Sequence, residues 1–290
     1  MTLQKNIVTE NTTNNSSTPK SVFTAIFFTD VHHSDKVFGA RGEWSTLGLT
    51  KLERVLEESA NCDFYVDFGD LSQYLPDGST ALYEEAYSFI SARTHGKRHY
   101  HLMGNHEAAF VEKSALSPFI PYKDGIGSAF VFEEGDVLFV AVDACFDRAT
   151  ALDGDLRRVT EFTIPKVQID YLSSEVKARM HGGIKGIVWV SHVAFKDIDD
   201  AKWQLVGELS AYGMPLSVFE GHTHSESFHT LTNGDLRVDI YTMTSVNVDF
   251  VLGTDLSKQR AQYVYYIVKF KDGRVESVTP IRKYLPLSDK

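Results

Sequence analysis

The chain has 290 residues, 43% of them apolar and 12% aromatic, which is enough to bury a substantial core and excludes a chain that is disordered throughout. Its net charge of −10 argues against a standing basic surface for duplex DNA or for an anionic membrane. The longest apolar runs, 137–146 and 187–195, are too short to span a bilayer, and two cysteines are too few for a disulfide framework. We therefore expect a soluble, cytoplasmic protein without a membrane partner.

Residues 1–20 differ in composition from the rest of the chain. They are rich in Asn, Ser and Thr and lack the apolar segment of a signal peptide, so we expect a disordered tail. From residue 21 onward no low-complexity linker and no internal repeat interrupts the sequence. Residues 21–290 are therefore predicted to form a single domain.

The first third of this domain alternates between strand and helix patterns. Runs of β-branched and aromatic residues predict three buried strands, at 22–29, 64–68 and 99–103. Thr50 and Glu53 form a capping-box pattern that predicts the start of a helix between the first two strands. Ser79 or Thr80 is expected to cap a second helix. Because helices separate successive strands, we expect parallel strands joined by crossover helices.

The rest of the domain combines these patterns with hairpins. A glycine-bearing loop predicts an antiparallel pair, at 128–132 and 137–142. Pro165 suits the first turn of a helix, and the segments after it predict a strand, a helix and a strand, at 187–190, 199–212 and 215–219. Asn233-Gly234 and Asp272-Gly273 then predict two further hairpins. The expected fold is α/β at first and antiparallel later.

Five of the predicted strands end in polar side chains of the kind that bind metals or transfer protons. In chain order these are Asp30 and His32, Asp70, Asn105 and His106, His192, and His222 with His224. In open α/β sheets ligands bind beyond the carboxyl ends of the strands, so we expect these residues to converge. Gly104 precedes one of the pairs, and we expect it to adopt a backbone angle that other residues avoid.

The set contains two carboxylates, one amide oxygen and several imidazoles. It exceeds what one tetrahedral ion needs and suits two neighbouring divalent ions. Two ions need a shared anion between them, and Asp70, alone at its strand end, is the predicted bridging carboxylate. A two-metal site holds both the attacking and the leaving oxygen of an in-line displacement, and a hydroxide between the ions would be the nucleophile.

The ordered motifs resemble those of the calcineurin-like metallophosphoesterases. They are Asp30-x-His32, Gly69-Asp70, Gly104-Asn105-His106-Glu107, His192 and Gly221-His222-x-His224, and the resemblance covers about residues 22–250. The resemblance implies a four-layer α/β/β/α sandwich, in which helices flank two mixed sheets and the metal centre lies at the strand ends.

The resemblance also implies a role for each motif residue. One ion would be held by Asp30, His32, Asp70 and His224, and the other by Asp70, Asn105, His192 and His222. His106 would assist the leaving oxygen or orient the phosphate. We expect two divalent ions, with Mn favoured and Fe, Zn, Ni or Mg as alternatives, because such a donor set accepts all of them.

Several departures from the family narrow the substrate class. Many members carry Asp where Glu107 stands, although Glu is found there in protein serine/threonine phosphatases and some nucleotidases. Those protein phosphatases also have Val-Asp-Arg-Gly where this chain has Leu71-Ser72-Gln73-Tyr74, and Gly where it has His33. These two differences disfavour a protein phosphatase. Many members of the family also have a further Asp shortly after the Gly-Asp pair, and this chain lacks it.

Four other residues are weaker candidates for contacts with a substrate. His33 follows the first motif, Tyr74 is suited to stacking on a base, and Arg148 and Arg157 match the geometry of phosphate. A position in a surface loop is the alternative for each of them. The remaining histidines are predicted to have structural roles; they are His95, His99, His101, His181 and His229.

Together these features predict a dimetal-dependent phosphohydrolase that cleaves a phosphodiester or phosphoanhydride, with a small nucleotide-type substrate. A small substrate is favoured because no appended recognition domain is visible. A phosphomonoesterase of the same mechanism is the first alternative, and a non-catalytic metal-binding scaffold is the second. The acidic charge disfavours nucleic acid as a partner, and the sequence leaves the oligomeric state open.

Overall fold

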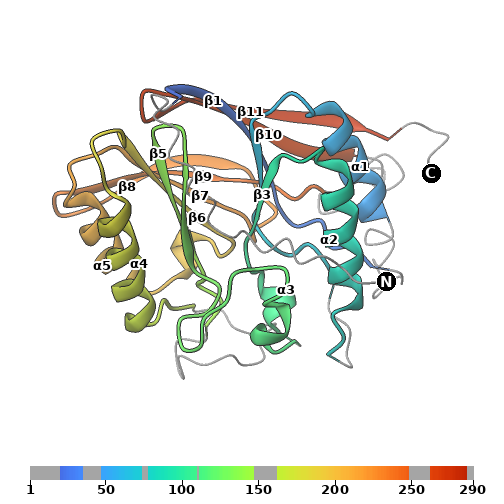
Figure 1. Ribbon diagram of the computed structural model, residues 1–290, viewed down its shortest axis with the longest axis horizontal. Coiled ribbons are helices and arrows are strands. Elements are labelled where there is room, and N and C mark those ends of the chain that lie inside the picture. The colour runs from blue at the N-terminus through green and yellow to red at the C-terminus, as the bar shows by residue number, and fades with distance from the viewer. Residues whose placement is uncertain are drawn as a thin grey trace.

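Two β-sheets lie face to face at the centre of the computed structural model, and helices cover the outer face of each sheet (Figure 1). The structure describes residues 20–34, 47–73, 78–109, 111–146, 162–247 and 262–285. Nearly all of the predicted tail, residues 1–19, lies outside these ranges. The order of the layers confirms the predicted sandwich of two mixed sheets flanked by helices.

The first sheet has five strands in the order β11-β10-β1-β2-β3. They are β1 (Val22–Phe28), β2 (Phe64–Asp67), β3 (Arg98–His101), β10 (Gln262–Lys271) and β11 (Arg274–Tyr284). β1, β2 and β3 run parallel, as predicted, whereas β10 pairs antiparallel with β1. Strands from the two ends of the chain are therefore neighbours in this sheet.

The second sheet has six strands in the order β4-β5-β6-β7-β9-β8. They are β4 (Phe130–Glu134), β5 (Val137–Val142), β6 (Gly186–Ser191), β7 (Leu216–Glu220), β8 (Ser227–Asn233) and β9 (Leu236–Thr242). The pairs β4–β5, β8–β9 and β10–β11 are antiparallel, which confirms the three predicted hairpins. However, β9 runs parallel to β7, because its hairpin joins the sheet through its second strand and leaves β8 at the edge.

Two pairs of helices form the outer layers. α1 (Gly48–Glu58) and α2 (Ala81–Arg93) lie on the first sheet, and α4 (Lys166–Arg179) and α5 (Ala201–Ser210) lie on the second (Figure 1). A short helix, α3 (Asn105–Ala108), follows the turn after β3. None of the helices in the described part of the chain combines the length and the apolar composition that a membrane crossing requires.

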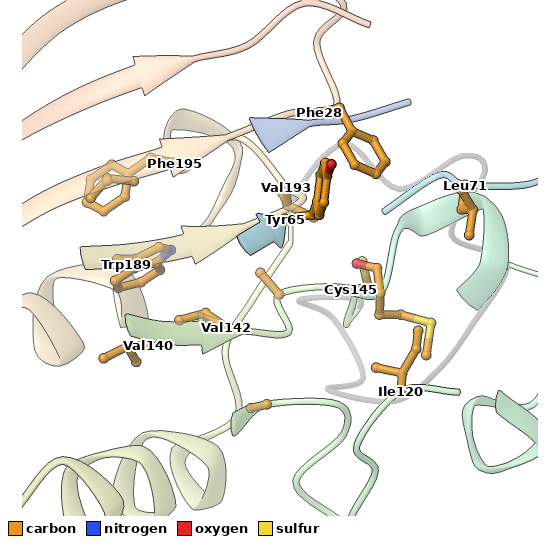
Figure 2. Close-up of a cluster of buried hydrophobic side chains, with 14 of the residues drawn as sticks. Phe28, Tyr65, Leu71, Ile120, Val140, Val142, Cys145, Trp189, Val193 and Phe195 are labelled. Atoms are coloured by element: carbon orange, nitrogen blue, oxygen red, sulfur yellow. The ribbon is translucent and has the colours of Figure 1, made fainter. Parts of the chain in front are cut away.

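The strands contribute side chains to two cores, one between the sheets and one beneath the helices. In β2, Phe64 and Val66 pack between the sheets, while Tyr65 packs on the opposite face, because successive residues of a strand point to opposite sides. Figure 2 shows part of the core beneath the helices, where Trp189 of β6 lies 5.7 Å from Phe195 between ring centroids. Burial on both faces fixes the strands whose ends carry the predicted site.

The start of α1 differs from the one predicted from Thr50 and Glu53. The helix begins at Gly48, Leu47 occupies the N-cap position, and no side chain caps the first turn. A Cβ atom at Gly48 would lie 2.7 Å from the carbonyl oxygen of Val31, so glycine lets the helix start against the chain that follows β1. Tertiary packing sets this boundary, and the capping-box prediction is wrong.

Candidate metal centre

Hydrogen bonds between backbone turns bring the predicted strand ends together. The N–H of Asp30, after β1, donates to the carbonyl of Gly69, after β2, at 3.0 Å. The N–H of Gly221, after β7, donates to the carbonyl of His192, after β6, at 3.1 Å. The two sheets are joined where the N–H of His222 donates to the Asp30 carboxylate at 3.2 Å. The predicted convergence at one rim of the sheets is therefore present.

One half of the site contains Asp30, His32 and His224. Asp30 Oδ1 lies 3.1 Å from His224 Nε2 and 3.6 Å from His32 Nε2. The Nε2 atoms of the two imidazoles are 3.0 Å apart. Asp70 Oδ2 lies 3.9 Å from His32 Nε2 and borders this group. Asp30 and His32 are almost fully buried, at 0% and 1% exposed.

The other half of the site also contains Asp70. Asp70 Oδ2 lies 3.3 Å from His192 Nε2. Asn105 Oδ1 lies 2.9 Å from His192 Nε2 and 2.8 Å from His222 Nδ1. Because Asp70 borders both groups, its carboxylate has the geometry that a bridging ligand needs.

The donor atoms of the two groups fit two divalent ions. Asp30 and Asp70 are buried carboxylates, and burying negative charge is costly unless cations are bound nearby. Their neighbours are imidazole nitrogens and an amide oxygen, a set that suits Mn, Fe or Zn. The Nδ1–H of His192 donates to the Phe68 carbonyl at 2.9 Å, which turns the lone pair of Nε2 toward the site. Histidines that bind metals are commonly oriented in this way.

Five of the seven predicted ligands have a left-handed backbone. Their φ angles are 57° at Asp30, 50° at His32, 51° at Asp70, 68° at His222 and 50° at His224. Such conformations cost about 1–3 kcal/mol each and are concentrated at functional sites. Aspartate and histidine tolerate them better than most residues, but no pattern in the sequence indicated them.

The glycines of the motifs allow close packing of the turns. Gly104 has φ −96° and ψ 168°, an ordinary extended conformation, so the predicted special backbone angle is wrong. A Cβ atom there would instead overlap the backbone nitrogen and Oδ1 of Asp70. A Cβ atom at Gly221 would overlap the hydroxyl of Thr29 and lie 3.1 Å from Asp30 Oδ2. Glycine is therefore required at Gly104 for space and not for conformation.

Glu107 holds two of these turns together, a role that was not predicted from the sequence. Its carboxylate accepts hydrogen bonds from the N–H groups of Gly104 at 3.0 Å, Asp70 at 2.9 Å and Ser72 at 3.0 Å. Burial and the nearby charge of Asp70 raise the pKa of Glu107 to about 8. The available signal was an acidic residue three positions after Gly104, where a carboxylate can accept backbone N–H groups.

His106 is oriented by Gln73, a residue that stands out in the sequence only as a difference from the protein phosphatases. His106 Nδ1 lies 2.9 Å from Gln73 Oε1, and because an amide oxygen only accepts, Nδ1 carries the proton. His106 Nε2 lies 3.8 Å from Asp70 Oδ2, and its backbone N–H donates to Asp70 Oδ1 at 2.8 Å. Burial lowers the pKa of His106 to about 4, so the imidazole carries no charge at neutral pH.

An open cavity of about 530 Å³ lies over the site. It is lined by Asp70, Asn105, His106, His222, Thr223, His224 and Ser225. His33 is not in this lining; it is 7% exposed, and its Nε2 lies 2.9 Å from Glu85 Oε2 of α2. Tyr74, Arg148 and Arg157 lie outside the described residues, and their contacts with a substrate stay predictions.

Metal uptake is expected to release protons at neutral pH. Burial acts to lower the pKa of His192, but the charge and hydrogen bond of Asp70 raise it to about 10. Burial and the neighbouring His192 lower the pKa of His222 to about 4. At neutral pH, therefore, a bound metal must displace a proton from His192, whereas the His222 imidazole is already neutral. The apparent affinity for metal should rise by about tenfold per pH unit for each proton displaced.

Titration calorimetry of the metal-free chain with Mn²⁺, in two buffers that differ in ionisation enthalpy, measures this proton release directly. The observed enthalpy is expected to differ between the buffers, and the size of the difference should correspond to the release of one proton or more per chain. An enthalpy that is the same in both buffers, with an affinity independent of pH, would contradict the protonation of His192.

Comparisons with known proteins agree with this fold. A family model described as calcineurin-like phosphoesterase matches residues 23–253. A dimetal phosphatase from Danio rerio is similar in structure, with a TM-score of 0.61 and 15% identity, over 92% of this chain and 100% of that chain. A purple acid phosphatase from yellow lupin (Lupinus luteus) seeds has a TM-score of 0.53 and 11% identity, over 93% and 55%. No curated protein matches. At these identities the solved structures show the fold alone.

Proposed function

This chain belongs to the calcineurin-like phosphoesterase family and is a metal-dependent phosphoesterase, and from that premise we propose that it cleaves a phosphodiester or phosphoanhydride of a small, nucleotide-type substrate. Two divalent ions, with Mn favoured, are proposed as cofactors. One would be held by Asp30, His32, Asp70 and His224, and the other by Asp70, Asn105, His192 and His222.

The composition of the cavity supports this substrate class. The described residues that line the cavity include no Lys or Arg. They include three histidines, and of these His106 is not a proposed metal ligand. A phosphomonoester carries close to two negative charges at neutral pH, whereas a phosphodiester carries one and needs less positive charge around it. The volume of about 530 Å³ falls within the range of small-molecule sites. These properties favour a small diester or anhydride over a monoester.

The state of His106 supports a substrate with a good leaving group. Because burial lowers its pKa to about 4, and because its Nδ1–H donates a hydrogen bond to Gln73, Nε2 has a free lone pair and no proton to donate. The leaving oxygen would therefore depart with little protonation, as it does from a phosphoanhydride or an aryl ester. When bound, two divalent ions would supply a water of lowered pKa and stabilise charge on the phosphoryl oxygens.

Chromogenic substrates test the proposal. Protein reconstituted with Mn²⁺ is expected to hydrolyse bis-p-nitrophenyl phosphate with a kcat/KM about tenfold or more above that for p-nitrophenyl phosphate. A panel of cyclic nucleotides, nucleotide pyrophosphates and nucleoside monophosphates would then identify the natural class. An equal or reversed preference would reject the diester and anhydride proposal in favour of a phosphomonoesterase.

A non-catalytic scaffold predicts a different result from the same samples. It would take up Mn²⁺ but turn over none of these substrates. The decisive variant is His222→Ala, which removes a ligand of one proposed ion, so it should lose that ion and with it hydrolysis if the proposed ligands act in catalysis. Hydrolysis that survives in His222→Ala would instead indicate a contaminating enzyme or another site.

A further inference from the structure

A second cluster of metal-binding side chains lies on the outer face of the first sheet. Asp67 ends β2, and His99 and His101 belong to β3. The strands are paired so that Asp67 lies opposite His101, and Tyr65 lies opposite His99. Because residues two apart on a strand share a face, both imidazoles lie on the same side of the sheet as the Asp67 carboxylate. None of these residues belongs to the metal centre described above.

Aromatic side chains of α2 cover His101. The ring centroids of Tyr87 and Tyr83 lie 4.7 Å and 6.5 Å from that of His101. The rings of His99 and His101 are themselves 3.7 Å apart. Asp67 is 0% exposed and His101 is 4% exposed, so bulk water has little access to their polar atoms.

Hydrogen bonds within the described part of the chain do not satisfy this cluster. His101 Nδ1 and Asp67 Oδ2 are 3.0 Å apart and form one hydrogen bond. Both ring nitrogens of His99, Nε2 of His101 and the hydroxyl of Tyr83 are buried without a partner among the described residues. An unpaired buried polar group is destabilising. A ligand that binds nitrogen lone pairs would relieve this deficit.

We propose that Asp67, His99 and His101 bind a third divalent ion, for which Zn²⁺ is the best chemical match. One ring nitrogen of each histidine and one carboxylate oxygen of Asp67 lie within 4.8 Å of one another. Donor atoms of a tetrahedral zinc site are about 3.3–3.5 Å apart, so small rotations of the side chains would complete the geometry. Two imidazoles and one carboxylate are a donor set that zinc accepts, and a water bonded to Tyr83 would fill the fourth position.

A cation satisfies the cluster better than a proton does. A proton on His101 would balance the charge of Asp67 but would leave both nitrogens of His99 unpaired. Burial, with His101 nearby, lowers the pKa of His99, so this imidazole stays neutral and keeps a lone pair for a metal. A divalent ion would use that lone pair and the carboxylate charge together.

The position of the cluster points to a structural role in supporting the turns after β2 and β3. Asp67 Oδ1 accepts a hydrogen bond from the N–H of Gly69 at 3.1 Å, and Gly69 precedes Asp70. The Asp67 carbonyl accepts from the N–H of Leu102 at 2.9 Å, shortly before Asn105. An ion bound here would therefore join the ends of β2 and β3 that present two of the proposed ligands.

Metal content of the full chain tests this site independently of catalysis. After loading with Zn²⁺ and removal of free metal, elemental analysis is expected to find three equivalents in the wild type and two in His99→Leu. The matched control is His95→Asn, which removes an exposed histidine whose φ of 53° asparagine tolerates, and it should keep three. Three equivalents in His99→Leu, or two in the wild type, would overturn the proposal.

A crystal of the zinc-loaded wild type gives a second test that does not depend on the folding of a variant. Anomalous scattering at the zinc edge is expected to show a peak among Asp67, His99 and His101, in addition to peaks at the metal centre. Absence of the first peak overturns the third site. A peak at the cluster with none at the metal centre would contradict the dimetal proposal instead, so the two failures are distinguishable.

Discussion

Replacement of Asp70 with asparagine is expected to lower kcat for phosphoester hydrolysis by about 1,000-fold or more. The carboxylate borders both groups of proposed ligands, at 3.9 Å from His32 and 3.3 Å from His192. Asparagine keeps the side-chain volume, tolerates the φ of 51° and retains an oxygen for the N–H of His106. It removes only the negative charge, and a loss of about 4 kcal/mol of metal-dependent stabilisation corresponds to this factor.

Steady-state kinetics with bis-p-nitrophenyl phosphate and metal analysis of the same samples measure this effect. The matched control is Asp272→Asn, which makes the same change at a similar φ, 48°, in the turn between β10 and β11. That variant should keep full activity. An Asp70→Asn protein that retains a tenth of wild-type activity would show that this carboxylate is not shared by the metals.

Replacement of Gly104 with alanine is expected to lower kcat by about 100-fold while changing no ligand. The added Cβ would overlap the backbone nitrogen and Oδ1 of Asp70, so the turn after β3 must move away from the turn after β2. A displacement of about 1 Å at a catalytic site is enough for a loss of this size. Overpacking of this kind should also lower the free energy of unfolding by about 1–3 kcal/mol.

Denaturant unfolding and steady-state kinetics separate the two consequences. Gly182→Ala is the matched control, because a Cβ atom at Gly182 would meet nothing within 4 Å. The control should match the wild type in both measurements. Wild-type kcat in Gly104→Ala would mean that the two turns can separate without disturbing the proposed ligands.

Local patterns predicted most of the fold, because its buried strands are short apolar runs bounded by turns, as in β5 and β6. The order of strands was beyond such patterns. Pairing of Val22 with Lys271 depends on contacts between opposite ends of the chain. The start of α1 also depends on contacts between separate parts of the chain, because the close packing of Gly48 against Val31 outweighs a favourable capping sequence.

Some features of the candidate site could likewise be predicted from the sequence, and others could not. Residue types at strand ends indicated the proposed ligands, because parallel strands present their carboxyl ends at one rim. The contacts of Glu107 and Gln73 were missed, since each acts on a turn from another strand. His99 and His101, considered without their neighbours, were predicted to have structural roles. Metal binding is proposed only because the pairing of β2 with β3 places Asp67 beside them.

The left-handed backbone of the proposed ligands has an evolutionary consequence. At a cost of about 1 kcal/mol or more at each of five positions, the total is about 5 kcal/mol or more, which reaches the lower end of the stability of a whole domain. A descendant released from any need for metal would become more robust by accepting glycine at these positions. Among descendants that no longer need metal, these five positions are therefore expected to be among the first of the motif to change.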